Sequence, residues 1–286
     1  MARLFITGGT GYLGGELLRQ ALAAGHVVAA SYFSQAPPDA SPAVWVPLDV
    51  RDALAVEDAL DQLRPEIVIH TAFRQGGPDL VATTAEGAGH VASACAAVGA
   101  RLIHMSSDVI FDGEREGSYS EADAPAPISD YGSAKAQAEH LVAAAHPGAA
   151  IVRTSLIYGF DPLDRQTQFA LEVAAGRRDD KLFVDEFRCP IYVVDLAAAL
   201  LELAALPYAG VLQIAGAERV SRHELGGLLA RACGLDASGI PGARSAESAV
   251  RRPRNCALDI RKAQALLHTK LRGVRTVLRA LGKLDA

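Results

Sequence analysis

The sequence predicts an α/β protein: a Rossmann-type, doubly wound parallel sheet with a smaller C-terminal lobe. Short apolar runs alternate along the chain with alanine-rich stretches of helical length. These runs are apolar throughout rather than at every second residue, which is typical of parallel strands covered by helices on both faces. A glycine-rich turn follows the first run. Half of the 286 residues are hydrophobic, which is enough for a large core, and the crossovers should be right-handed.

The strands are expected where short apolar runs are bounded by turns or helical stretches. They cover residues 3–7, 26–31, 44–48, 66–72, 101–107 and 149–155. Helices are expected between them, at 13–24, 53–63, 84–98 and from Tyr131 onward. After Tyr158 the pattern is less regular. Its predicted elements are a helix at 192–203, a strand at 211–215 and a loop at 239–253.

Composition excludes several classes of function. The net charge is −5 and the pI is about 5.9, so the chain lacks the positive field that holds a nucleic-acid backbone. Its four cysteines form no C-x-x-C pair and no histidines have metal-ligand spacing, so no disulfide framework or metal site is predicted. The N-terminus lacks a signal-peptide pattern, and no run of about 18 residues is free of polar side chains. We therefore expect a soluble, cytoplasmic protein that binds neither nucleic acid nor membrane.

The segment TGGTGYLGGELL (7–18) joins the first predicted strand to the first predicted helix. Its glycines satisfy both G-x-x-G-x-x-G and G-x-G-x-x-G. Such glycines permit a tight turn, a close approach of a pyrophosphate to the backbone, and close packing of helix on strand. The phosphates then lie at the helix N-terminus, where free N–H groups and the helix dipole point. The predicted contacts with a dinucleotide come from Gly8, Thr10, Gly11, Tyr12, Leu13 and Gly14.

The second predicted strand ends in SYFSQ (31–35), which contains no acid. NAD-binding chains often place an acid there to hold the ribose hydroxyls, so a 2′-phosphate would not be repelled. No arginine is close in the sequence to bind it. We favour NADP as the cofactor and leave NAD open. Asp49 and Val50 are expected at the adenine, although Asp49 or Asp52 fits equally well as a helix cap. Thr71 and Ala72 are expected along the path of the cofactor.

These features predict two domains. Residues 1–155 should form an NAD(P)-binding Rossmann domain, to which 191–215 returns. Residues 156–190 and 216–286 should form a smaller substrate-binding lobe.

The segment YGSAK (131–135) places Tyr131 and Lys135 four residues apart at the start of a helix, and therefore on one face. A free phenol has a pKa near ~10, and a neighbouring ammonium lowers it. The same lysine can donate to the nicotinamide ribose, so both residues are also predicted cofactor contacts. Ser107, at the end of the fifth strand, can hydrogen-bond a substrate carbonyl. Together the three residues predict catalysis in which hydride reaches a carbonyl carbon while the tyrosine supplies a proton.

This constellation resembles the extended short-chain dehydrogenase/reductase superfamily over nearly the whole chain. Within it, the likeness is strongest to dTDP-4-dehydrorhamnose reductase and its relatives. That family carries S-T-D-x-V-F-D-G, Y-G-x-x-K, R-T-S-W-V-Y-G and R-P-x-x-S-x-L-D, in this order. The corresponding segments here are SSDVIFDG (106–113), YGSAK, RTSLIYG (153–159) and RPRNCALD (252–259). The resemblance implies a reductase of a keto sugar nucleotide, with Ser107, Tyr131 and Lys135 as the catalytic triad.

Three residues depart from the family pattern. Leu156 stands where the family often has tryptophan, Cys256 replaces a serine, and Val109 replaces an aromatic residue. We expect all three to line the substrate pocket, so the resemblance implies the reaction type more strongly than the sugar. Sugar dehydratases of the superfamily carry Thr-Asp-Glu where this chain has Ser107-Asp108-Val109. The missing second carboxyl excludes elimination of water, and Asp108 is either a substrate contact or a turn residue.

Two arginines of the C-terminal half are candidate contacts for an anionic substrate, since arginine donates bidentately to phosphate. Arg188 lies in DEFRCPIYVVDLA (185–197), which resembles a superfamily segment that brings an arginine toward the sugar nucleotide. A surface ion pair with Asp185 or Glu186 is the alternative. Arg252 lies in a basic run that fits a solvated loop equally well. Among the histidines, His70 and His104 are expected in the core or beside the cofactor.

Two other functions remain open. Some relatives of this reductase family bind NADP and serve as non-catalytic regulatory subunits of another enzyme. Nucleotide-sugar epimerases use the same serine, tyrosine and lysine with a retained cofactor. The expected partner is a small molecule, a nucleotide sugar, and a homodimer is common in the superfamily.

Overall fold

The computed structural model describes residues 1–38 and 41–285. The chain divides into two compact units, which we call the first and the second unit. The first unit comprises Met1–Ser107, Asp130–Arg153 and Ala197–Leu212. The second comprises Asp108–Ser129, Thr154–Leu196 and Gln213–Ala286. Within the described ranges, every helix is too short or too polar to cross a membrane.

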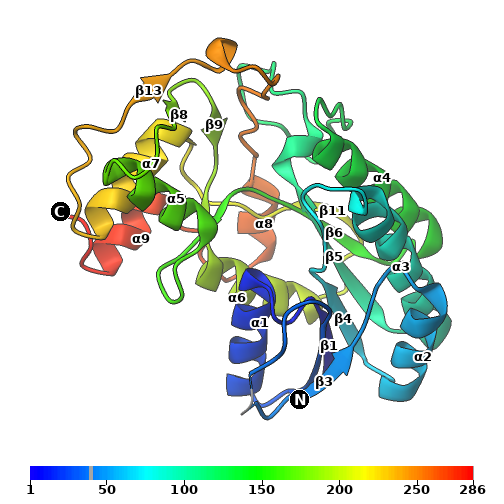
Figure 1. Ribbon diagram of the computed structural model, residues 1–286. Helices are drawn as coiled ribbons and strands as arrows, with labels where there is room; N and C mark the ends of the chain where they lie inside the picture. The colour runs from blue at the N-terminus through cyan, green and yellow to red at the C-terminus, as the bar shows by residue number, and fades with distance from the viewer. Residues whose placement is uncertain (39–40, 286) are drawn as a thin grey trace. The chain divides into compact units, whose positions relative to one another are not determined.

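The first unit is built on a seven-stranded sheet (Figure 1). Its strands are β1 (Arg3–Thr7), β2 (Val27–Tyr32), β3 (Val44–Pro47), β4 (Ile67–His70), β5 (Arg101–Ser107), β6 (Ala150–Thr154) and β11 (Gly210–Gln213). They follow the order β11-β6-β5-β4-β1-β2-β3, with β1 pairing in parallel with both β2 and β4. The direction of winding reverses between β1 and β4, and ligands of such sheets bind at the carboxyl ends of the strands at this point. The predicted fold class is confirmed.

The helices of the first unit cover both faces of this sheet. They are α1 (Tyr12–Ala23), α2 (Ala53–Leu63), α3 (Gly87–Val98), α4 (Asp130–Ala145) and the greater part of α6 (Val193–Ala204). Figure 1 shows α2, α3 and α4 along one face and α1 and α6 on the other. The predicted helix at 84–98 begins as a π-helix, η1 (Ala82–Glu86), and such π segments occur frequently at functional sites.

Alternate residues of the strands pack under α2, α3 and α4. Fully buried apolar side chains of this core include Phe5, Val68 and Leu102. Two residues further along the same strands, on the same face, stand Thr7, His70 and His104. The apolar core therefore gives way to buried polar residues at the carboxyl ends of the strands, where the candidate site lies.

The second unit consists of short elements around smaller cores. Its helices are α5 (Arg165–Ala174), α7 (Arg222–Ala232), α8 (Arg261–Leu266) and α9 (Val274–Ala280), with the short 3₁₀ turns η2 (Asp108–Ile110) and η3 (Ser245–Glu247). Its two-residue strands are β7 (Ile157–Tyr158), β8 (Leu182–Phe183), β9 (Phe187–Arg188), β10 (Ile191–Tyr192), β12 (Val220–Ser221) and β13 (Gly242–Ala243). The strands pair as β10–β7, β12–β9 and β13–β8. A capping box of Ser221 and Glu224 begins α7, and α5, α7 and α9 share a buried apolar cluster.

Several segments differ from the sequence-based expectation. Of the segment 191–215, expected to return to the first domain, residues 197–212 group with the first unit. Residues 108–129, expected in the first domain, group with the second unit, because the backbone of Tyr119 donates to Ala257 and accepts from Asp259. The predicted loop 239–253 contains β13 and η3. The hydrogen bonds of Tyr119 and the pairing of β13 with β8 each join segments that lie far apart in the sequence. Local sequence patterns do not reveal such contacts.

Candidate functional site

The glycine turn between β1 and α1 has the geometry of a phosphate-binding loop. Gly8 has a positive φ of 70°, a conformation that a side chain disfavours. A Cβ on Gly14 would lie 2.2 Å from the carbonyl oxygen of Gly8, so turn and helix pack too closely for any side chain there. Gly11 begins α1 as an N-cap without a capping side chain. The first N–H groups of the helix are therefore suited to bind an anion from outside the chain.

A pocket of about 350 Å³ opens beside this turn, and we call it the first-unit pocket. Four segments line it: the glycine turn, the end of β2, the residues after β3, and the residues after β4. The lining residues are Gly8, Thr10, Gly11, Ser31, Tyr32, Phe33, Ser34, Gln35, Leu48, Asp49, Val50, Thr71, Ala72, Phe73, Arg74 and Thr83. A nicotinamide dinucleotide fits the groups that line this pocket. The uncapped N-terminus of α1 can bind its diphosphate, and the neutral end of β2 and the carboxylate of Asp49 lie on the same pocket. Tyr12, Leu13 and Gly14, the other predicted contacts, form the first turn of α1.

The structure separates the roles of two aspartates that the sequence left open. Asp52 caps α2, since its side chain accepts a hydrogen bond from the backbone of Ala55. Asp49 instead lines the first-unit pocket and is held by Arg51, with 2.6 Å between Arg51 Nη2 and Asp49 Oδ2. The hydrogen bonds from Arg51 lower the pKa of Asp49. Asp49 is therefore available to the pocket as a carboxylate.

Sequence reasoning missed two arginines near the end of β2. The guanidinium carbon of Arg51 lies 5.5 Å from the ring centroid of Phe33, and Arg74 lines the first-unit pocket. The sheet order provided the missing signal, because β2 lies between β3 and β1, and β1 adjoins β4. The residues that follow β3 therefore lie beside the end of β2, and those that follow β4 lie one strand further away, on the same pocket.

Tyr131 and Lys135 of α4 meet at one aromatic ring. The ring centroid of Phe73 lies 5.8 Å from that of Tyr131 and 5.0 Å from Lys135 Nζ. Phe73 also lines the first-unit pocket. Both side chains are thus directed to the pocket side of α4, as the four-residue spacing predicts.

Lys135 is a buried cation with few internal partners. Its side chain is 3% exposed, and Nζ donates to the carbonyl oxygen of Met105 at 2.8 Å. Burial lowers the pKa of Lys135 to about 8, against the opposing influence of Glu139. Glu139 is itself bound by Arg153, at 2.8 Å between Oε2 and Nη2. The ammonium is consequently mostly charged at neutral pH and easily deprotonated above it.

Two buried histidines lie near Lys135. Thr7 Oγ1 and His70 Nδ1 are 2.7 Å apart, and the rings of His70 and His104 stack at 5.4 Å. Burial lowers the pKa of His70 to about 3, with Lys135 adding to the effect, and the pKa of His104 is lowered for the same reasons. Both imidazoles are therefore neutral. The described residues contain no group of metal-ligating side chains.

Ser107 and Asp108 occupy different surroundings. Ser107 ends β5 and is half-buried. Asp108 begins η2 and is buried, and its Oδ2 accepts from Ser155 Oγ at 2.6 Å. Arg188 Nε lies 3.7 Å from the same oxygen. Asp108 is thus part of a buried polar network rather than an exposed turn, and its contact with a substrate stays a prediction.

Arg188 is 3% exposed, so the expectation of a surface arginine is wrong. The expected pairing with Glu186 is present, at 3.0 Å between Arg188 Nη2 and Glu186 Oε1. The guanidinium also donates to the carbonyls of Phe187 and Pro253. A phosphate contact by Arg188 stays a prediction, and it would require some of these bonds to be exchanged.

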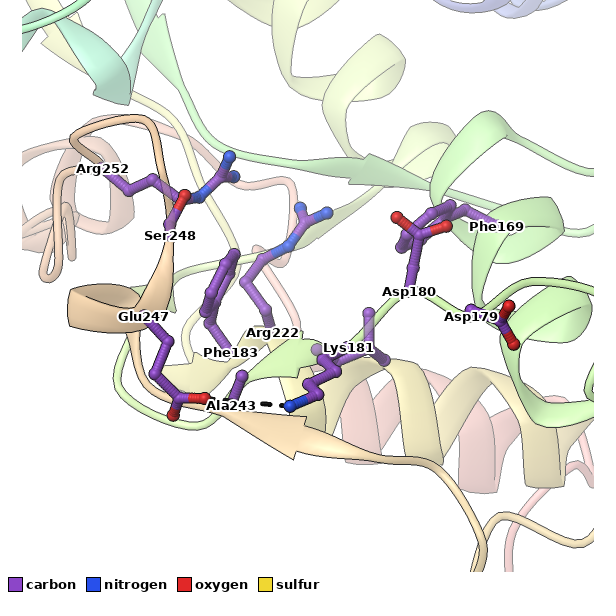
Figure 2. Close-up of a pocket in the computed structure, with 11 residues that line it drawn as sticks. Phe169, Asp179, Asp180, Lys181, Phe183, Arg222, Ala243, Glu247, Ser248 and Arg252 are labelled. Atoms are coloured by element: carbon purple, nitrogen blue, oxygen red, sulfur yellow. Dashed lines mark ion pairs between the residues drawn. The ribbon is translucent and has the colours of Figure 1, made fainter.

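Arg252 lines a pocket of about 520 Å³ in the second unit, which we call the second-unit pocket (Figure 2). Its guanidinium lies 4.9 Å from the ring centroid of Phe183, and Nε donates to Glu186 Oε2 at 2.6 Å. Figure 2 shows Arg222 and Arg252 beside Phe183, with the Lys181–Glu247 ion pair at another edge. Asp179, Asp180 and Glu247 also line this pocket, so, apart from the Lys181–Glu247 pair, its positive charge is confined to the side where Arg222 and Arg252 lie beside Phe183. Two arginines beside an aromatic ring can bind an anion that carries a flat ring.

The three residues that depart from the family pattern do not line the second-unit pocket in the described part of the chain. Cys256 is fully buried, and its thiol donates to the carbonyl of Phe111. Leu156 is half-buried against the apolar cluster of α5, α7 and α9, and Val109 is half-buried in η2. Burial of Cys256 contradicts the expectation that it reaches the substrate.

Comparison with known proteins gives consistent relatives. The family model described as RmlD substrate binding domain matches residues 2–284. A dTDP-4-dehydrorhamnose reductase of Mycobacterium tuberculosis is 34% identical over 96% of this chain and 91% of its own length. Methionine adenosyltransferase 2 subunit beta of Rattus norvegicus is 27% identical over 92% of this chain and 82% of its own. The crystal structure of dTDP-4-dehydrorhamnose reductase from Bacillus anthracis, in complex with NADP, is 23% identical and superposes with a TM-score of 0.84, covering 98% of each chain.

Proposed function

The chain belongs to the RmlD substrate binding domain family, and we propose that it is an NAD(P)H-dependent reductase of a keto sugar nucleotide. The convergence of Tyr131 and Lys135 on Phe73, a wall of the first-unit pocket, carries this proposal. This arrangement places a proton donor, the phenol of Tyr131, and a cation, the ammonium of Lys135, beside the pocket that begins at the glycine turn. The relatives named dTDP-4-dehydrorhamnose reductase support the same reaction class.

The catalytic roles follow from the chemistry of the three side chains. When bound, the reduced nicotinamide supplies the hydride. Tyr131 donates a proton to the carbonyl oxygen of the substrate, and the ammonium of Lys135 lowers the pKa of the phenol and so favours that transfer. Ser107 donates a hydrogen bond to the same carbonyl oxygen. Burial of Lys135 strengthens its electrostatic effect on the phenol, because solvent screens the charge less.

The second-unit pocket is the proposed site for the nucleotide part of the substrate. Arg222 and Arg252 supply positive charge, and Phe183 supplies an aromatic face. Burial lowers the pKa of Arg222 to about 10, so it remains charged at neutral pH. Diphosphate binding by two arginines beside a ring is the chemistry that a nucleoside diphosphate sugar requires.

The test is reduction of a panel of keto sugar nucleotides, beginning with dTDP-4-keto-6-deoxyhexose, followed by nicotinamide absorbance. Tyr131→Phe should lower kcat by about 10²–10⁴-fold while leaving cofactor binding nearly unchanged. Tyr208→Phe is the matched control, because that hydroxyl donates to the carbonyl of Val211 and lines neither pocket. Full turnover by Tyr131→Phe would overturn the mechanism, and no turnover across the panel would overturn the function.

A non-catalytic regulatory subunit is the second candidate, favoured by the likeness to methionine adenosyltransferase 2 subunit beta. It predicts one stoichiometric enzyme partner in a pull-down and no consumption of cofactor with any keto sugar. An epimerase would instead keep its cofactor bound and unchanged after turnover. Net consumption of cofactor in the absorbance measurement therefore identifies the reductase. Conversion of the sugar without such consumption identifies the epimerase, and a stoichiometric enzyme partner with no conversion identifies the regulatory subunit.

A further inference from the structure

The end of the first-unit pocket near β2 is a charged site that the proposed reaction does not use. Two charged residues line the pocket among those described, Asp49 and Arg74. Arg74 contributes to lowering the pKa of Asp49, so the two charges interact. Ser34 and Gln35 follow β2 on the same wall and are neutral. The charge balance at this end therefore depends on Arg74.

The other arginine of this region is already neutralised. Arg51 Nη2 lies 2.6 Å from Asp49 Oδ2, and Arg51 Nη1 lies 2.9 Å from Asp79 Oδ2. Two carboxylates against one guanidinium leave this cluster with one excess negative charge. An additional anion would be repelled by the cluster, unless a further cation stands beside it.

Arg74 is that cation, and its backbone is fixed. Thr84 Oγ1 accepts from the backbone N–H of Arg74 at 2.9 Å and donates to its carbonyl at 2.8 Å. Thr84 is 1% exposed and lies in the π-helix η1. The described residues place no acid within ion-pair distance of the Arg74 guanidinium, which is on an exposed residue. The chain thus holds the origin of this side chain rigidly while leaving its donors for a ligand.

We propose that Arg74 binds the 2′-phosphate of NADP(H) and thereby sets the preference of this protein for NADP(H) over NAD(H). The inference rests on the proposed function only in that the first-unit pocket takes a nicotinamide dinucleotide. A guanidinium binds phosphate oxygens with two parallel hydrogen bonds. The absence of an acid in 31–35 leaves room for the phosphate, and Arg74 balances the excess charge of the neighbouring cluster.

Removal of the Arg74 side chain should weaken the binding of NADP⁺ and leave the binding of NAD⁺ nearly unchanged. The variant Arg74→Gln loses the cation and leaves the negative cluster facing the 2′-phosphate. The Kd for NADP⁺ should rise by about 10–100-fold, whereas the Kd for NAD⁺, which lacks this phosphate, should change by less than about twofold. The difference should shrink as ionic strength rises, because the guanidinium is reached by solvent.

Binding can be measured without turnover through the single tryptophan. Trp45 lies against the glycine turn, since a Cβ on Gly9 would lie 2.9 Å from its ring. Its fluorescence should therefore respond to a nucleotide in the pocket. Titrations would compare NADP⁺ with NAD⁺, and adenosine 2′,5′-bisphosphate with AMP, with calorimetry as an independent readout. The last two probes differ only in the 2′-phosphate.

Two further variants complete the design. Arg64→Gln is the matched control, because Arg64 is exposed, follows α2 and pairs with Asp61; both Kd values should stay unchanged. Arg74→Lys should recover part of the preference, since lysine restores the charge without the planar fork.

If Arg74→Gln weakened the binding of NADP⁺ and NAD⁺ equally, Arg74 would contact a phosphate that both nucleotides share, and the inference would be overturned. Unchanged binding of both would overturn it as well. A wild-type protein that binds NADP⁺ without reducing any keto sugar would contradict the proposed function and leave this inference standing. A wild-type protein that binds neither nucleotide would overturn both.

Discussion

Each unit of this protein buries a cation, Lys135 in the first and Arg188 in the second, and both side chains are 3% exposed. Lys135 has a carbonyl as its hydrogen-bond acceptor among the described residues, and Glu139, the acid that raises its pKa, is engaged by Arg153. Arg188 has two carboxylates within 3.7 Å and two carbonyls. The pKa of the lysine falls to about 8, while that of the arginine is raised.

This difference indicates two roles: Lys135 is a cation available to a ligand, and Arg188 is a cation that stabilises the fold. The chain satisfies Arg188 with its own acceptors, so its removal would leave the buried Asp108 without a cation and Glu186 with one guanidinium instead of two. Among the described residues, Lys135 donates one hydrogen bond, to the carbonyl of Met105, so further N–H donors are left for a ligand at the cost of desolvation. Lysine suits the first role because its pKa shifts readily on burial, and arginine suits the second because it stays charged and donates in a fixed fork.

The largest expected effect is on stability, at Arg188. Arg188→Met removes the cation beside the buried Asp108 and leaves the buried Glu186 with Arg252 alone, and it should lower the free energy of unfolding by about 3–5 kcal/mol. Denaturant unfolding measures the change. A loss below about 1 kcal/mol would show that the two buried cations do not differ in the way described.

The opposite sign is expected at Lys135. Lys135→Met removes a buried charge and keeps the Glu139–Arg153 pair, so the free energy of unfolding should rise by roughly 1–3 kcal/mol. Turnover should fall at least about a hundredfold under the proposed mechanism. Unfolding and absorbance assays on the same preparation would measure both. A destabilised variant would mean that Lys135 is a structural residue like Arg188.

The pH dependence sharpens the same comparison. Because the folded pKa of Lys135 is about 8, below its value of about 10.4 in an unfolded chain, the unfolded chain binds more protons between these values. The burial penalty is complete below pH 8, and stability should rise with pH through this window, by up to about 1.4 kcal/mol per pH unit. Lys135→Met should lack this contribution to the slope. Activity should move oppositely and decline above about pH 8, as the ammonium loses its proton.

The smallest effect is expected at the edge of the arginine network. Ser155→Ala removes the hydroxyl that donates to Asp108 and accepts from the backbone of Cys189. The free energy of unfolding should fall by about 1–2 kcal/mol, the cost of a buried hydrogen bond left unmade. A loss as large as that of Arg188→Met would show that the serine, rather than the arginine, holds Asp108 in place.

Short-range sequence patterns were sufficient to predict the fold class, the glycine turn and the shared face of Tyr131 and Lys135. The strand–helix alternation predicted the sheet, and the glycine spacing predicted the turn of Gly8, Gly11 and Gly14, because both depend on neighbours along the chain. Helical periodicity likewise placed Tyr131 and Lys135 on one face. The motifs in SSDVIFDG and RTSLIYG indicated the family, which the family model and the relatives confirm.

Only the tertiary structure decided which groups meet across the sequence. It brought Phe73 to the α4 pair, Arg74 to Asp49, and Arg188 into the core. Sheet order and loop packing set these contacts, and neither leaves a periodic signal in the sequence. Charge and burial also depend on all neighbours at once, so the lowered pKa of Lys135 follows from the fold rather than from the YGSAK motif that contains it.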